Sequence, residues 1–190
     1  MTPPPIIVDA GANIGAFTLL AAQRFPKAKI LSFEPEIENY DLLMENINLN
    51  HLSGRVTAIK HALAEKIEER IFYISNFEYA HSLLKEQVAD SNKTELVVKC
   101  VTLPQIMQDY NITFIDILKL DIEGSEYEVL YQLPNEIYNK IGAILLEIHT
   151  SDLYKREDLI EFLKKHGFHV SPSPTHPRVF ICTKSRNKEL

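Results

Sequence analysis

Residues 8–15 read VDAGANIG and follow directly on the apolar pair Ile6 and Ile7. An apolar run that ends in an acid and a glycine-containing turn predicts a strand followed by a loop. From Ile14 to Phe25 the apolar residues recur at helical spacing, and Pro26 ends the pattern. This part of the chain therefore predicts a strand, a loop and a helix in succession.

The same succession recurs along the chain and predicts an α/β fold. Further strands are predicted at 29–33, 56–59 (an extension to Leu63 is left open), 71–74, 96–98, 115–120, 143–148, 168–170 and 178–183. Further helices are predicted at 40–49, after the start signal Glu34-Pro35-Glu36, and at 103–110, 125–133 and 154–166. Strands that alternate with helices predict a mostly parallel sheet with helices on both faces. The last two strands are too close for a helical crossover, so the last strand should be antiparallel.

Composition limits the class of protein. A chain of 190 residues suits a single domain over 1–190, with a core from about 6 to 184. The formal net charge of -6 argues against nucleic acid or an anionic membrane as a partner. No apolar run approaches the roughly 18 residues needed to span a bilayer, so a cytoplasmic location is expected. The polar stretch 75–94, which contains His81, is interpreted as a surface excursion that faces a substrate.

The glycine loop and the acid that ends the second strand predict a ligand that contains a nucleoside. Gly11 and Gly15 leave room for a ligand near the backbone, and the helix that follows offers free amide groups. Glu34 lies about twenty residues farther on, where a carboxylate accepts hydrogen bonds from ribose hydroxyls. The alternative that the two glycines only form a tight turn stays open.

Two cofactors fit this arrangement, NAD and S-adenosylmethionine. A dinucleotide fingerprint needs a glycine where this chain has Asn13. Asp9 would repel a pyrophosphate but would attract the ammonium of a methionine moiety, directly or through water. S-adenosylmethionine is therefore favoured, while an NAD-type oxidoreductase and a non-catalytic cofactor-binding module stay open as alternatives.

Four stretches carry a resemblance to a known family: VDAGANIGAFTLL, SFEP, LKLDIEGSEYEVL (residues 118–130) and LLEIH (residues 145–149). They resemble the FkbM-type methyltransferases, a branch of the S-adenosylmethionine-dependent class I enzymes. The resemblance implies a Rossmann-like, seven-stranded sheet of order 3-2-1-4-5-7-6 with the last strand antiparallel. It also implies that the methionine part lies against Asp9, Gly11, Asn13 and Gly15, the ribose against Glu34, and the adenine near His61 and Ala62.

The expected reaction is methylation of a hydroxyl on a small molecule, a sugar or a secondary metabolite. A hydroxyl acceptor needs a group that takes its proton, and candidates follow the fourth and fifth strands of this sheet. Asp121 is expected to orient the acceptor or the sulfonium, His149 to act as general base, and Glu123 to assist. Each could instead be a helix-capping or merely polar strand-end residue. No cluster shows convincing metal spacing, although DIE and EIH could together offer oxygen and nitrogen ligands.

Overall fold

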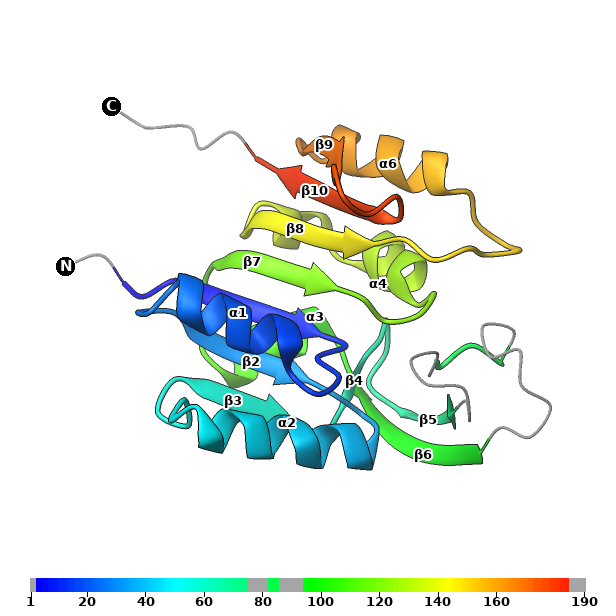
Figure 1. Ribbon diagram of the computed structural model, residues 1–190. Coiled ribbons are helices and arrows are strands. Elements are labelled where there is room, and N and C mark those ends of the chain that lie inside the picture. The colour runs from blue at the N-terminus through cyan, green and yellow to red at the C-terminus, as the bar shows by residue number, and fades with distance from the viewer. Residues whose placement is uncertain (1–2, 75–81, 86–93, 185–190) are drawn as a thin grey trace.

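The computed structural model describes residues 3–74, 82–85 and 94–184. Its main sheet has seven strands, which lie side by side in Figure 1. Its strands are β1 (Ile6–Ala10), β2 (Lys29–Phe33), β3 (Val56–Ile59), β7 (Ile115–Leu120), β8 (Ile141–Glu147), β9 (His169–Pro172) and β10 (Val179–Thr183). Their order is β3-β2-β1-β7-β8-β10-β9, and β10 is antiparallel to both of its neighbours. The sheet order predicted from the sequence is confirmed.

Helices cover both faces of the main sheet. The helices are α1 (Ala16–Arg24), α2 (Ile37–Leu49), α3 (Leu103–Asp109), α4 (Glu126–Gln132), α5 (Asn135–Tyr138) and α6 (Arg156–Lys165). Figure 1 shows α1 and α2 in front of the sheet, where Ala21 and Leu43 belong to one buried cluster with Ile7. Val8 belongs to a second cluster, with residues of α3, α4 and α6. Alternate residues of β1 thus fill two cores, which explains its continuous apolar sequence.

The helix starts follow from local sequence. Glu36 precedes α2, and its carboxylate accepts hydrogen bonds from the backbone N–H groups of Glu38 and Asn39. Thr102 does the same for α3, where its hydroxyl accepts from Gln105 N. Such caps satisfy amide groups that have no partner inside the helix. The helix α5 was not predicted. Among the described helices, none combines the length and the apolar character that a bilayer crossing requires.

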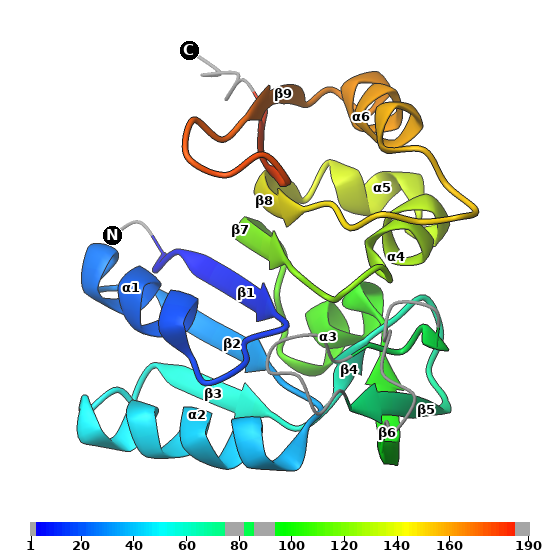
Figure 2. The same cartoon turned by 45° about the vertical axis from the view of Figure 1, so that its right-hand side comes forward.

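A separate small sheet lies beside the carboxyl ends of the main strands (Figure 2). It consists of β4 (Ala62–Leu63), β5 (Glu69–Ile74) and β6 (Thr94–Val101) in the order β4-β6-β5. The third main strand ends at Ile59, so the extension to Leu63 that the sequence left open belongs to a different sheet. The reason is a parallel pairing of β4 with Cys100 and Val101.

The excursion 75–94 falls largely outside the described residues, including His81. Within it, Ser82 forms a backbone bridge to Tyr73, and both Ser82 and Leu83 are buried. The described part is therefore a packed segment of the small-sheet region.

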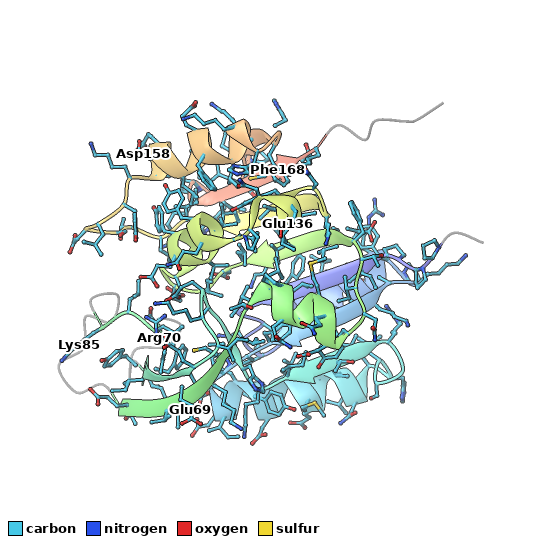
Figure 3. All side chains as sticks on the ribbon, turned by 180° about the vertical axis from the view of Figure 1, so that it is seen from behind. Glu69, Arg70, Lys85, Glu136, Asp158 and Phe168 are labelled. Atoms are coloured by element: carbon cyan, nitrogen blue, oxygen red, sulfur yellow. The ribbon has the colours of Figure 1, made fainter. Side chains whose placement is uncertain are left out.

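Arg70 joins the small sheet to the helix layer. Its guanidinium lies 3.0 Å from Glu65 and 3.7 Å from Glu128 of α4. Figure 3 shows Arg70 and the neighbouring Glu69 on the small sheet, on the opposite side of the molecule from Asp158 of α6. The ion pairs hold the small sheet against α4, at the edge where the strands of the main sheet end.

Candidate active site

A cleft opens at the carboxyl ends of β1, β2 and β7. Its position is the point where the order of a parallel sheet reverses, which is where ligands bind in such sheets. The main sheet and the small sheet both contribute to its wall. The lining residues are Gly11, Asn13, Phe33, Glu34, Pro35, Asn39, Ala62, Leu63, Phe72, Leu83, Asp121, Ile122 and Glu123.

The glycine loop, residues 11–15, requires glycine for two different reasons. Gly11 has a φ of +76°, and a Cβ there would lie 1.8 Å from the backbone oxygen of Asp121. Gly15 has a φ of +95°, and a Cβ there would lie 2.7 Å from the Leu43 side chain. Gly11 lines the cleft, whereas Gly15 packs against α2 outside the lining. Its predicted contact with the cofactor stays a prediction.

Glu34 is nearly buried at the end of β2 and lines the cleft. Its carboxylate accepts hydrogen bonds from the backbone N–H groups of Asn13, at 2.7 Å, and Glu36, at 3.0 Å. Burial raises the pKa of Glu34 to about 7, against the effect of these two hydrogen bonds. The glycine loop and the predicted ribose acceptor are thus one hydrogen-bonded unit.

Asp9 lies beneath the glycine loop and does not line the cleft. Its side chain is fully buried, and one carboxylate oxygen accepts a hydrogen bond of 2.6 Å from the hydroxyl of Thr18. The other oxygen lies 3.4 Å from the ammonium nitrogen of Lys119. The charge of Asp9 is therefore paired with Lys119 of the same protein. The predicted attraction of Asp9 for the methionine ammonium stays a prediction.

Lys119 connects the loops that follow β1 and β7. Its ammonium donates a 2.6 Å hydrogen bond to the carbonyl oxygen of Gly11 and lies 3.3 Å from Asp121. Burial by itself would lower the pKa of Lys119, but Asp9 and Asp121 outweigh it and raise that pKa. The side chain stays charged and holds both loops at one point.

His149 is surrounded by carboxylates. Its Nδ1 lies 2.9 Å from Glu126, and its Nε2 lies 3.2 Å from Glu123, 3.8 Å from Glu147 and 3.9 Å from Asp121. Burial of the ring opposes its charged form, but the hydrogen bond to Glu126 and the nearby carboxylates raise the pKa of His149 to about 9. The ring therefore carries a proton at neutral pH.

Glu123 belongs to the acidic loop, residues 121–125, which follows β7. The strand ends at Leu120, so Glu123 does not continue the alternation of β7. Its backbone has a φ of +51°, and its carbonyl accepts a 2.6 Å hydrogen bond from the hydroxyl of Ser82. Burial raises the pKa of the Glu123 carboxyl to about 7, although His149 acts in the opposite direction. Glu123 thus changes its charge near neutral pH at the wall of the cleft.

Glu126 organises the acidic loop from below. An acid in the first turn of a helix is favoured by the helix dipole in any case. In the structure Glu126 is fully buried, and its two oxygens accept hydrogen bonds from the N–H groups of Ile122, at 3.0 Å, and Gly124, at 2.9 Å. In the sequence, the signal for this role is the position of Glu126, four residues after Ile122 and two residues after Gly124.

The apolar end of the cleft comes from the small sheet. Ala62 lines it, as the predicted adenine contact requires, whereas His61 lies outside the lining and borders a separate depression beside Lys99. Phe72 and Leu83 complete this wall. The sequence did not reveal that Phe72 and Leu83 line the cleft. Phe72 lies in a predicted strand and Leu83 in the polar stretch 75–94, and neither pattern indicates that these segments fold back toward the first strand.

The strand order, together with a cleft at the ends of β1, β2 and β7, defines the Rossmann-like class I methyltransferase fold. Solved structures agree: methyltransferase FkbM from Methylobacillus flagellatus superposes with a TM-score of 0.59 at 16% identity, over 96% of this chain and 44% of that chain.

The family model for the methyltransferase FkbM domain matches residues 9–170, and this chain belongs to that family. Membership confirms the resemblance, and with it the cofactor, S-adenosylmethionine. Methyltransferase sdnD of Sordaria araneosa is 31% identical over 170 residues, 75% of this chain and 66% of that protein. The 31-O-demethyl-FK506 methyltransferase FkbM of Streptomyces tacrolimicus is 26% identical over 90% of this chain and 75% of its own length. The chain thus spans only part of these relatives.

Proposed function

We propose that the protein transfers the methyl group of S-adenosylmethionine to a hydroxyl of a small molecule, such as a sugar or a secondary metabolite. The observation that carries this proposal is the position of Asp121 and Glu123 at the wall of the cleft, with His149 directly behind them. A hydroxyl must lose its proton as it is methylated, and these groups offer a place for it.

The cofactor supplies an electrophilic methyl group on a sulfonium, and the shape of the cleft fits such a molecule. Glu34 offers carboxylate oxygens to ribose hydroxyls. Phe72, Leu83 and Ala62 offer an apolar surface to a base ring. Gly11 and Asn13 leave a path for the methionine part between the two, toward Asp121.

Asp121, held by Lys119, positions the acceptor and the sulfonium. Its carboxylate, anchored by Lys119 at 3.3 Å, places negative charge beside the path of the sulfonium and of the acceptor. Holding the two reactants close together in line is the main way to accelerate such a displacement.

The pair Glu123 and His149 takes the proton of the acceptor. A base works best when its pKa lies near the working pH, and the Glu123 pKa of about 7 meets that condition. The protonated His149, 3.2 Å away, stabilises the ionised form of Glu123. His149 itself serves as the predicted general base only after it has lost its own proton.

Two further observations favour a small hydroxyl-bearing acceptor. The name of the Streptomyces relative describes methylation at an oxygen. The net charge of -6 disfavours a polyanionic acceptor such as nucleic acid. Two observations disfavour the NAD-type oxidoreductase. The chain has Asn13 where a dinucleotide fingerprint has glycine, and it belongs to a methyltransferase family.

Calorimetric titration with S-adenosylhomocysteine and mass spectrometry of a metabolite extract, incubated with methyl-labelled cofactor, test the proposal. We expect cofactor binding and a labelled methyl ether, reduced about a hundredfold by Glu123→Gln. Glu161→Gln, at an exposed site on α6, is the matched control and should act like the wild type. Cofactor binding without any labelled product would favour the non-catalytic module, and a labelled RNA would contradict the small acceptor.

A further inference from the structure

Three groups that bind metals in other proteins meet at the end of β7 and β8. Asp121 and Glu123 follow β7, and His149 follows β8, its parallel neighbour. One ligand atom from each residue lies within 4.8 Å of the other two. The sequence separates His149 from Glu123 by 26 positions, so the cluster has no recognisable metal spacing, but the sheet brings the three residues together.

The imidazole ring is already oriented as in metal sites. The ring Nδ1 of His149 is hydrogen-bonded to the buried carboxylate of Glu126. The backbone carbonyl of His149 accepts a 3.0 Å hydrogen bond from the hydroxyl of Tyr127. Histidines that bind metals usually donate the second ring N–H to a carboxylate in this way. The ring is 95% buried and directs its Nε2 toward Glu123 and Asp121.

The charges around the ring do not balance. Four carboxylates, those of Asp121, Glu123, Glu126 and Glu147, lie within 4 Å of its two nitrogens. Within the described part of the chain, the permanent cations in ion pairs with them are Lys119, which Asp121 shares with Asp9, and Arg178, 2.8 Å from Glu147. The carboxylates thus outnumber these cations, and such a cluster favours a bound cation.

We propose that Asp121, Glu123 and His149 bind a divalent cation of the Mn²⁺ type at the acceptor side of the cleft. Carboxylate oxygens suit Mg²⁺ and Mn²⁺, and one imidazole nitrogen favours a transition metal over Mg²⁺. Neighbouring ligand atoms of a six-coordinate ion lie about 3 Å apart, so the observed 3.2 Å between His149 Nε2 and Glu123 needs little movement. A cation at this point would take the place of the proton on His149.

The proposal deepens the proposed function and rests on it for the role of the cation. Asp121 and Glu123 line the cleft, so a cation held by them has an open side toward the acceptor. A hydroxyl bound to the cation becomes more acidic, so it loses its proton more easily.

Titration with Mn²⁺, followed by electron paramagnetic resonance of the free ion, tests binding without any methyl acceptor. We expect one site per chain, and a loss of affinity of about tenfold or more in Asp121→Asn and Glu123→Gln. Glu161→Gln and His169→Gln change exposed residues of α6 and β9 and should bind like the wild type. Circular dichroism melts show whether each variant is folded.

The histidine ligand has its own signature. Electron spin-echo modulation from a nitrogen nucleus should appear in the Mn²⁺ complex of the wild type, persist in Glu123→Gln and disappear in His149→Gln. Absence of Mn²⁺ binding at millimolar concentration, or equal binding by wild type and folded Glu123→Gln, overturns the proposed site. Titration of the same samples with S-adenosylhomocysteine separates the two proposals: cofactor binding without Mn²⁺ binding refutes only the cation site, whereas Mn²⁺ binding without cofactor binding refutes the methyltransferase function.

Discussion

The glycine loop and the acidic loop are neighbours on one edge of the main sheet, yet different interactions hold them. Backbone and side-chain groups together hold the glycine loop: the N–H groups of Gly11 and Ala12 donate to the carbonyl of Phe33, Glu34 accepts from the N–H group of Asn13, and Lys119 donates to the carbonyl of Gly11. In the acidic loop, Glu126 accepts from two N–H groups, and Ser82 donates to the carbonyl of Glu123. Both loops therefore depend on charged groups, and the acidic loop in addition carries two of the carboxylates that surround His149.

Lys119 lies in β7 and contacts both loops, so its replacement should have the largest effect. Lys119→Met leaves the fully buried Asp9 without a cation, and we expect it to lower the free energy of unfolding by about 4 kcal/mol. Urea denaturation measures the change. The matched control is Lys164→Met, which removes an exposed pair with Glu161 and should cost less than about 1 kcal/mol. Equal costs for the two variants would contradict the role given to Lys119.

Gly11→Ala should disturb the glycine loop at its contact with Asp121 of the acidic loop. The added Cβ would lie 1.8 Å from the backbone oxygen of Asp121, and the φ of residue 11 is +76°. We therefore expect the free energy of unfolding to fall by about 3 kcal/mol and cofactor binding to become unmeasurable. Thermal melts and calorimetry report both. Gly54→Ala is the control, because no atom lies within 4 Å of its Cβ. A Gly11→Ala variant with wild-type affinity would show that the loop is not close-packed.

Glu126→Gln should disturb the acidic loop alone. The amide keeps the shape but loses the charge that holds Ile122, Gly124 and His149, so we expect a cost of about 2 kcal/mol. The pKa of His149 should fall from about 9, since the bond to Glu126 is the main contribution that raises it. Nuclear magnetic resonance titration of the ring measures this shift. Glu136→Gln, at an exposed site on α5, should leave the pKa unchanged.

The smallest expected effect is a pH dependence on the side of the glycine loop. The pKa of Glu34 is about 7, so its carboxylate forms as the pH rises from about 6 to about 8. The ionised form is the stronger acceptor because neither oxygen carries a proton, and we expect S-adenosylhomocysteine to bind up to about tenfold more tightly over this interval. In Glu34→Gln the residue cannot titrate and this gain should vanish. An equal gain in wild type and variant would assign the pH dependence to another group.

The alternation of apolar runs with helical periodicity was sufficient to locate the strands of the main sheet, whereas their order was predicted from the resemblance to the FkbM-type methyltransferases. Glu34 was found from its place at the end of the second strand, about twenty residues after the glycine loop. Two strands of the small sheet were predicted in part, at 71–74 and 96–98, but their sheet was not, because β4 pairs with residues 38 positions away and nothing in a two-residue strand reveals its partner. Asp121 and His149 were predicted to follow neighbouring strands, but only the structure shows that His149 Nε2 lies 3.9 Å from Asp121.

The small sheet gives the cleft a wall that is built separately from its base. Within the described residues β4, β5 and β6 form no hydrogen-bonded ladder with the main sheet, yet Phe72 and Leu83 belong to the wall of the cleft. Replacement of these side chains should change how the base ring of the cofactor fits while the strands that support the glycine loop stay intact. The fold thus combines an adjustable wall with a constant base, and this separation offers a starting point for redesign of the cofactor site.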